Sequence, residues 1–533
     1  MKLRWSSGSS ALQSAVEHWL AKPEEHSCEV LSESNYRRVV RLAVDRKPTV
    51  VAVKEFFPVS ARKTFSKRAI AAVQHLAQHG PAQREWKALN TLHAAGVSVP
   101  KPLGFAQASM GGAYLVSEFV DGAVSLSEVL DDYAFKRHRI LRTVGELVHQ
   151  FHNAGFTHGD LHVGNIAIGD RGPVLVDLQQ VHPIEHEGDR LRDIAFLDFS
   201  LAHMGITLHD RLRFRIAALG LGLFRVAPER ELLREIGRAS TARALDYYRG
   251  RTRHMSRPGP DVAALRCGEQ TGLRSKDFPE ASVSTAIDLH RKHVQTGGPA
   301  LLKCDHRSHV SAVEVDGHHL VVKEVVKTTL RKRLADVFRG SPARRAWVAG
   351  HGLRIRGIGA AKPLAFLETK RRGVPVASVV ILEDLSASRC VADVPADDLT
   401  APQLAQHLLQ LVLRMHRTNT SHQDFQASHM FWLDENAGPR IGGTSPLALI
   451  DLEGVQFHEQ LHDRHRISML SELNATLSDN FLPPHPRREL LKRYLRALPF
   501  ERGNDRSVRE IVRRSLARAQ AWKGTGCNFN RSS

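Results

Sequence analysis

Hydrophobic positions near the start of the chain follow the two-residue alternation of strands and then the wider spacing of a helix. The segments V-V-R-L-A-V (39–44) and T-V-V-A-V-K-E-F (49–56) predict two strands around the turn D-R-K-P. Helical spacing over 83–95 ends at Gly96, a common C-cap residue, and A-Y-L-V-S-E-F (113–119) predicts a further strand. A long helical remainder follows. Strands first and helices afterwards predict an α+β fold with two lobes.

The same order of elements occurs twice along the chain. Residues 81–105 and 342–366 align without a gap, and 11 of 25 positions are identical. Similar offsets then relate three further pairs of polar residues: Lys54 and Lys323, Asp160 and Asp424, Asp177 and Asp451.

A period near 265 residues is too long for a solenoid and indicates a duplicated domain. Turn formers and charged residues cluster shortly before the second copy, which places the expected boundary near 275–295. We therefore expect two tandem domains, 1–285 and 286–533.

The most informative motif of the first copy is H-G-D-L-H-V-G-N, from His158 to Asn165, followed by Asp177 in V-L-V-D-L. This spacing is typical of a kinase catalytic loop and the metal-binding aspartate that follows it. Phosphoryl transfer needs a carboxylate that accepts the proton of the attacking hydroxyl, which predicts Asp160 as the base, with His158 in the same catalytic loop. Asn165 and Asp177 are the predicted Mg²⁺ ligands, because magnesium prefers oxygen donors. The alternative is a polar turn between a helix and a strand.

The sequence before this loop contains three residues that are predicted to form the ATP-binding site. Lys54 lies in V-V-A-V-K-E-F, a close match to the strand lysine that contacts the α- and β-phosphates. Glu85, on the following helix, is its expected ion-pair partner, and Glu118 ends a strand where a hinge presents backbone groups to adenine. A solvated strand lysine and an exposed helix charge are the plainer alternatives. The segment 32–40 contains no glycine-rich phosphate loop, unlike eukaryotic protein kinases.

The second copy keeps part of this set. H-Q-D-F-Q-A-S-H (422–429) retains Asp424 at the position of the base, but His429 replaces the asparagine. Lys323 is its predicted nucleotide-binding lysine and Asp451 its predicted metal ligand. A neutral imidazole is a poor Mg²⁺ ligand.

Two further positions of the second copy have lost their polar residues. Ala346 stands where the first copy has Glu85, and Ile467 where it has Asp193. The second domain is accordingly either an active kinase or a scaffolding pseudokinase.

Composition narrows the choice of partners. The 533 residues carry a net charge of +19 and a pI of about 10.0, which favours anionic partners. No helix-turn-helix, zinc or aromatic-platform signature is present, so we expect no nucleic acid. The five cysteines form no C-x-x-C pair, which fits a reducing compartment.

No signal peptide and no membrane span are expected, so any membrane contact is peripheral. The segment 506–522 has helical apolar spacing, with arginines opposite. This helix either packs its apolar face on its own domain or lies on anionic lipid.

The first copy resembles the bacterial lipopolysaccharide core kinases, which comprise heptose kinases and 3-deoxy-manno-octulosonic acid (Kdo) kinases. The resemblance rests on H-G-D-L-H-V-G-N with D-L-Q-Q, on R-E-W-x-A-L-x-x-L-H-x-x-G-V-x-V-P-K-P-L, and on D-R-L-R-D-I-A-F-L-D-F-S, and covers most of residues 30–210. It implies a protein-kinase-like fold and transfer of the γ-phosphate of ATP to an inner-core sugar hydroxyl. It also implies Asp160 as base, Asn165 and Asp177 as Mg²⁺ ligands, and Asp193 as a structural aspartate.

The resemblance implies a cytoplasmic protein that acts at the cytoplasmic face of the inner membrane. Heptose kinases are similar to the second copy in having a histidine at the position of His429, so this substitution is compatible with activity. Two other functions stay open. One is a kinase of a soluble small molecule or of a protein serine, since aminoglycoside and choline kinases share the loop. The other is a kinase-shaped regulatory or binding protein.

Overall fold

The chain divides into two compact units, Met1–Ala244 and Leu245–Ser533. The computed structural model describes residues 4–6, 10–22, 28–33, 37–44, 49–57, 81–107, 112–120, 122–132, 136–221, 227–326, 336–394, 401–433, 446–479 and 481–524. The predicted turn D-R-K-P lies outside the described residues.

Unit 1 begins with a six-stranded antiparallel sheet in the order β1-β5-β6-β4-β3-β2. The predicted strands are confirmed as β3, β4 and β6, and the predicted helix as α3. The strands are β1 (Arg4–Trp5), β2 (Cys28–Glu33), β3 (Arg37–Val44), β4 (Thr49–Phe56), β5 (Pro102–Gln107) and β6 (Ala113–Glu118), and the helices beside them are α1 (Ser10–Ala21) and α3 (Pro81–Ala94).

Different helices cover the two faces of this sheet. On β4, Val51 and Val53 are buried in a cluster shared with α1, whereas Phe56 belongs to the core that includes α3. Because side chains alternate along a strand, Lys54 points to the same face as Phe56. The sheet therefore presents Lys54 to the helix that carries Glu85.

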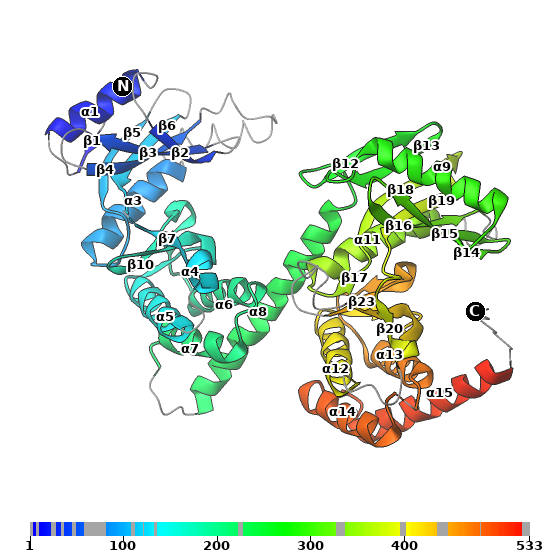
Figure 1. Ribbon diagram of the computed structural model, residues 1–533. Coiled ribbons are helices and arrows are strands. Elements are labelled where there is room, and N and C mark those ends of the chain that lie inside the picture. The colour runs from blue at the N-terminus through cyan, green and yellow to red at the C-terminus, as the bar shows by residue number, and fades with distance from the viewer. Residues whose placement is uncertain are drawn as a thin grey trace. The chain divides into compact units, whose positions relative to one another are not determined.

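The second lobe of unit 1 is helical, with short strands on either side of the loop that carries Asp160. Gly145 of α5 lets α7 approach closely, because a Cβ at this position would lie 2.6 Å from the Cβ of Ala217. Its elements are β7 (Val124–Ser125), α4 (Leu126–Asp132), α5 (Arg137–Asn153), β8 (Phe156–Thr157), β9 (Ile166–Gly169), β10 (Gly172–Leu175), β11 (His182–Pro183), α6 (Glu187–His203), α7 (Leu208–Ala218) and α8 (Ala227–His254), within which the division into units falls. Figure 1 shows β2–β6 with α1 at one end of this unit and α5–α7 at the other.

Unit 2 repeats the arrangement with a seven-stranded antiparallel sheet in the order β12-β13-β18-β19-β16-β15-β14. One face packs against α9 and the other against α11, as α1 and α3 do in unit 1. These elements are β12 (Val262–Cys267), β13 (Gln270–Ser275), α9 (Glu280–Thr296), β14 (Leu301–Cys304), β15 (Ser308–Val315), β16 (His318–Val325), α11 (Pro342–Ile355), β18 (Pro363–Arg371) and β19 (Val374–Glu383).

The division between units differs from the boundary expected at 285–286, which falls inside α9. The hairpin β12–β13 pairs with β18, and α9 packs against β15, so both belong to the second sheet. Turn-rich sequence therefore marked a connection within unit 2, because strand pairing across about 90 residues leaves no local signal.

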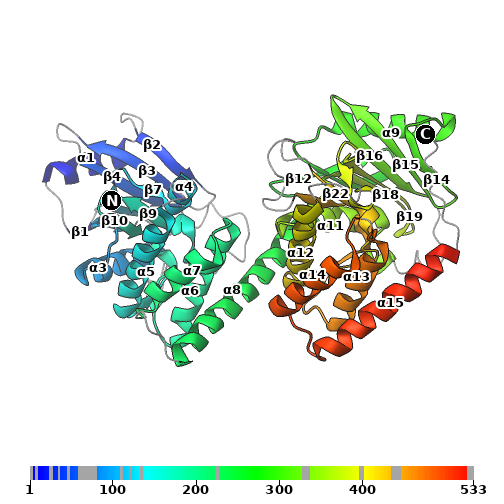
Figure 2. The same ribbon diagram turned by 60° about the horizontal axis from the view of Figure 1, so that its bottom comes forward.

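The helical lobe of unit 2 completes the repeat (Figure 2). Its elements are β17 (Gly359–Ala360), β20 (Arg389–Cys390), α12 (Ala401–Arg417), β21 (Thr420–His422), β22 (Met430–Trp432), β23 (Leu447–Leu449), β24 (Val455–Phe457), α13 (Asp463–Thr476), α14 (Pro484–Ala497) and α15 (Asn504–Gly524). Strands come first and helices after in both units, which confirms the α+β tandem architecture. Within the described ranges, no helix combines the length and apolarity that crossing a bilayer requires.

Candidate active site

The loop that carries Asp160 in unit 1 is held by Asp193 of α6. Asp193 is buried and accepts hydrogen bonds from the backbone N–H of His158 at 2.6 Å and of Gly159 at 3.0 Å. The ring of His152 lies 3.2 Å from the same carboxylate. These contacts fix the loop backbone, which is the structural role expected for Asp193.

Asn165 braces the same loop from its other end. Its side-chain nitrogen donates to the backbone carbonyl oxygen of Asp160 at 2.8 Å, and its backbone carbonyl accepts from the N–H of Val176 at 3.0 Å. Because the amide nitrogen is committed to Asp160, the side-chain oxygen remains as the atom that can ligate a cation. The carboxylate of Asp160 is partly exposed, and Gln180 donates to it at 3.3 Å.

Asp177 follows β10 in the left-handed backbone conformation, with φ of 62°. Its Oδ1 lies 2.6 Å from a guanidinium nitrogen of Arg37 and 3.6 Å from Nζ of Lys54. Burial opposes the charge on this carboxylate, but Lys54 and Arg37 together hold the pKa of Asp177 below its usual value. It is therefore an anion at neutral pH.

The predicted ion pair between Lys54 and Glu85 is present. The Glu85 carboxylate is almost fully buried beneath the sheet, and Lys54 reaches it from β4. Lys54 thus lies between two carboxylates, Glu85 and Asp177. This is the arrangement in which a cation can contact phosphate while staying fixed in place.

The remaining two predicted residues of unit 1 lie outside this group of contacts. His158 is fully buried, its Nε2 lies 3.2 Å from the carbonyl oxygen of Val176, and burial lowers its pKa below the ordinary value. A neutral, enclosed imidazole can connect the loop to the segment that ends in Asp177, but it cannot reach the hydroxyl group of a substrate. Glu118 is exposed, and its backbone N–H already donates to the carbonyl of Lys101 at 2.9 Å.

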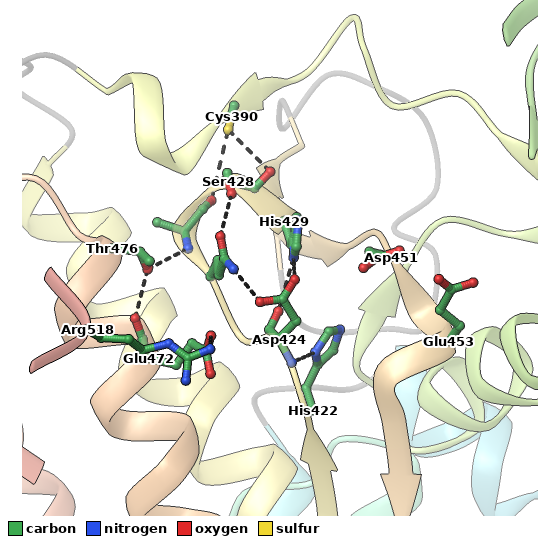
Figure 3. Close-up of polar contacts among 12 residues, drawn as sticks. Cys390, His422, Asp424, Ser428, His429, Asp451, Glu453, Glu472, Thr476 and Arg518 are labelled. Atoms are coloured by element: carbon green, nitrogen blue, oxygen red, sulfur yellow. Dashed lines mark hydrogen bonds and ion pairs between the residues drawn. The ribbon is translucent and has the colours of Figure 1, made fainter. Parts of the chain in front are cut away.

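In unit 2, His429 occupies the place of the asparagine. Its Nδ1 lies 3.0 Å from the carbonyl oxygen of Asp424 and 3.6 Å from its carboxylate. Gln426 also donates to this carboxylate, and His422 accepts from the N–H of Asp424 at 3.0 Å (Figure 3). Burial lowers the pKa of His422 to about 4, so this ring is neutral.

In unit 2 the helix glutamate is absent, and Lys323 pairs with other carboxylates. Ala346 at that position is buried in the core, and Lys323 Nζ lies 2.7 Å from Asp451 and 3.1 Å from Glu453. Burial opposes the ammonium charge, yet Glu453 and Asp451 raise the pKa of Lys323. Both of its anionic partners come from the segment after β23. Alignment to the first copy identified Asp451 but not Glu453.

Sequence reasoning also missed Glu472 on α13. This carboxyl group is buried beside Asp424 and pairs with Arg518 of α15 (Figure 3). Burial raises the pKa of Glu472 to about 7. The corresponding residue of unit 1, Asp198, instead binds Arg211 and Arg215. Because the corresponding residues have different partners, alignment of the two copies did not predict the contacts of Glu472.

The donor sets of the two units suit different cations. In unit 1, Asn165 and Asp177 offer oxygen atoms only, which fits Mg²⁺. In unit 2, Asp424, His429 and Asp451 each place a possible ligand atom within 4.8 Å of the others. The imidazole makes this a mixed nitrogen and oxygen set, less suited to magnesium.

Known sugar kinases match parts of this chain. The lipopolysaccharide core heptose(I) kinase WaaP of Pseudomonas aeruginosa is 26% identical over 174 residues, which are 29% of this chain and 63% of that protein. The 3-deoxy-D-manno-octulosonic acid kinase of Vibrio parahaemolyticus is 32% identical over 107 residues, or 19% and 44% of the two chains. The chain thus spans less than two thirds of either relative.

Among solved structures, WaaP in complex with acyl carrier protein aligns with a TM-score of 0.34 and 21% identity, covering 45% of this chain and 98% of that one. The lipopolysaccharide kinase (Kdo/WaaP) family matches residues 20–217 and again residues 303–494. The first match contains the Asp160 loop and the second contains the Asp424 loop, which confirms the resemblance found in the sequence. Both units together therefore make this chain a member of the lipopolysaccharide kinase (Kdo/WaaP) family.

Proposed function

We propose that unit 1 is an ATP-dependent kinase that phosphorylates a sugar hydroxyl, heptose or Kdo, of the lipopolysaccharide inner core. One observation carries this proposal. Asp160 and Asn165 share one braced loop, while Asp177 and the Lys54–Glu85 pair form a connected group beside it. This set matches what phosphoryl transfer requires: a base, oxygen ligands for a cation, and a fixed cation for phosphate.

Each residue has a distinct part in the proposed reaction. The acceptor hydroxyl loses its proton to Asp160, its oxygen bonds to the γ-phosphorus of ATP, and ADP leaves. Lys54, kept in place by Glu85, binds the phosphates of ATP. Asn165 and Asp177 are the residues that would hold Mg²⁺, which neutralises phosphate charge when bound.

Three positioning parts complete the proposal. His158 holds the segment that ends in Asp177, Asp193 fixes the loop backbone, and the segment after Glu118 faces the nucleobase. The exposed side chain of Glu118 itself has no part in the transfer.

The acceptor substrate and the cellular location are inferred from the charge of the chain and from its relatives. A net charge of +19 suits an acceptor rich in phosphate and carboxylate. Relatives named as heptose(I) kinase and Kdo kinase support these two sugars as the candidates. We infer that the protein acts in the cytoplasm against the inner membrane, where its basic surface meets anionic glycolipid.

We propose a supporting role for unit 2, in which it binds the glycolipid rather than transferring phosphate. Lys323 is committed to Asp451 and Glu453, and His429 replaces the oxygen ligand of unit 1. Asp424 keeps the position of a base, but in this proposal it transfers no proton.

The acceptor is tested by offering the purified chain ATP and Mg²⁺ with one acceptor at a time. Core lipopolysaccharide stripped of phosphate is compared with free heptose, free Kdo and a serine-containing protein, and phosphate transfer is followed by mass spectrometry. We expect transfer to the glycolipid. Transfer to a soluble acceptor alone would replace the proposed substrate, and transfer to none would favour a regulatory role.

A further inference from the structure

Arg37 is the residue of unit 1 that neither the kinase motifs nor the proposed reaction has used so far. It is the first residue of β3, directly after the β2–β3 connection. In a kinase fold this connection carries the glycine-rich loop whose backbone covers the phosphates. Here the sequence of that segment has no glycine, so backbone donors of that kind are not supplied in the usual way.

Strand register directs Arg37 into the site. Val39 pairs directly with Lys54 on the neighbouring strand, so the two side chains share a face of the sheet. Arg37 lies two residues before Val39 and therefore on the same face. Its guanidinium accordingly reaches Asp177 at 2.6 Å, and the side chain is only 16% exposed.

Two cations thus converge on one carboxylate. Lys54 lies 3.6 Å from the same Oδ1 of Asp177 and is already paired with Glu85. The ion pair of Arg37 with Asp177, at 2.6 Å, is the shorter of the two. A divalent cation arriving at Asp177 would repel the guanidinium and compete for this carboxylate.

A guanidinium displaced beside the cation site is well suited to bind phosphate. Its planar fork of N–H donors matches the oxygen atoms of a phosphate group, and charge-assisted bonds of this type are among the strongest in proteins. Lys54 and Arg37 lie near the same oxygen of Asp177, so a nucleoside triphosphate bound by Lys54 would have this guanidinium in its surroundings.

Unit 2 provides an internal comparison. Its register pairs Val310 with Lys323 and Ser308 with Val325, as Val39 pairs with Lys54 and Arg37 with Phe56 in unit 1. Ser308 therefore stands where Arg37 stands. The unit whose loop and metal residues are degenerate also has no arginine at this position.

We propose that Arg37 is a phosphate ligand of the ATP site, which exchanges between Asp177 when the site is empty and the terminal phosphates of MgATP when it is filled. In this role it replaces the donors of the missing glycine-rich loop. The inference rests on the proposed function of unit 1 and adds a binding residue to it.

The test measures MgATP binding by titration calorimetry on the full chain. Every protein carries Lys323→Met, so that unit 2 contributes no lysine contact to phosphate. Arg37→Gln keeps the length of the side chain and removes the charge, and Arg37→Lys keeps the charge without the fork. Arg38→Gln is the matched control, because Arg38 pairs with Glu55 on the opposite face of the same strand.

We expect the Kd for MgATP to rise at least about tenfold in Arg37→Gln, to rise less in Arg37→Lys, and to stay unchanged in Arg38→Gln. Circular dichroism identifies a misfolded variant, in which case Arg37→Lys supplies the comparison. Unchanged or tighter binding by Arg37→Gln would overturn the inference alone, since Arg37 would then only cover Asp177. No binding by the parent chain would overturn the proposed function, and the inference with it.

Discussion

Asn165 and His429, different residues at corresponding places in the two units, make the same contact with the loops that carry Asp160 and Asp424. Asn165 Nδ2 lies 2.8 Å from the carbonyl oxygen of Asp160, and His429 Nδ1 lies 3.0 Å from that of Asp424. The brace is therefore retained in unit 2 while the side-chain oxygen is lost. Loop geometry and cation binding are separate properties of this position.

This separation predicts different results for two substitutions of Asn165. Asn165→His should keep the loop brace and weaken Mg²⁺ binding, because an imidazole suits magnesium poorly. Asn165→Ala should lose both. Hydrogen exchange over residues 158–166 reports the brace, and Mg²⁺ titration in the presence of ATP reports the cation site. Fast exchange in Asn165→His would show that the two side chains are not equivalent.

The contacts of Asp193 predict a large effect of its removal. Asp193→Ala leaves the N–H groups of His158 and Gly159 without their buried acceptor, which should cost about 3 kcal/mol of unfolding free energy. Faster hydrogen exchange in residues 156–165 measures this loss.

Ile467 is the matched control, because it occupies the corresponding position in unit 2. There the N–H of Gln423 donates to the carbonyl of Gly454 at 2.9 Å instead. Ile467→Ala should therefore loosen packing without speeding exchange at residues 422–429. Equal effects on both loops would contradict a specific role for Asp193.

Glu472 predicts how stability depends on pH. Its folded-state pKa is about 7 against an ordinary 4.5, so the folded protein favours the neutral acid. Its contribution to stability is complete below pH 4.5 and is lost as the pH rises towards 7, by about 3 kcal/mol. Glu472→Gln should remove this part of the pH dependence in denaturant titrations between these pH values, and a variant with unaltered pH dependence would contradict the assignment.

The Lys54–Glu85 pair predicts a coupling between two substitutions. Lys54→Met leaves the buried Glu85 carboxylate without its cation and should destabilise the contact between β4 and α3 by about 3 kcal/mol. Adding Glu85→Gln should recover part of this loss, because it removes the unpaired charge. Hydrogen exchange in Pro81–Ala94 measures both variants, and additive losses would mean that the pair is not coupled.

Local sequence patterns predicted the elements that carry the site in unit 1. Alternation over 49–56 predicted the strand that carries Lys54, and helical spacing over 83–95 predicted the helix that carries Glu85. Their pairing was expected from the place of the corresponding glutamate in a kinase fold. The loop from His158 to Asn165 was found because its spacing is contiguous in the chain. The buried position of His158 was not predicted, since burial depends on packing by α5 and α6.

Contacts that depend on distant pairing were missed. Arg37 reaches Asp177 across 140 residues, and Lys323 reaches Glu453 across 130. Arg37 and Glu453 stand in no recognised motif, and each contact exists because strand register and the fold of the helical lobe bring the two residues together. The start of the second sheet at β12 was missed for the same reason.

The most direct test of the account compares phosphate transfer to dephosphorylated core lipopolysaccharide by the full chain, by Asp160→Asn and by Asp424→Asn. The account predicts that Asp160→Asn lowers the rate at least about 100-fold, because a general base is lost, while Asp424→Asn retains most of it. Full activity in Asp160→Asn, or loss confined to Asp424→Asn, would contradict the assignment of catalysis to unit 1.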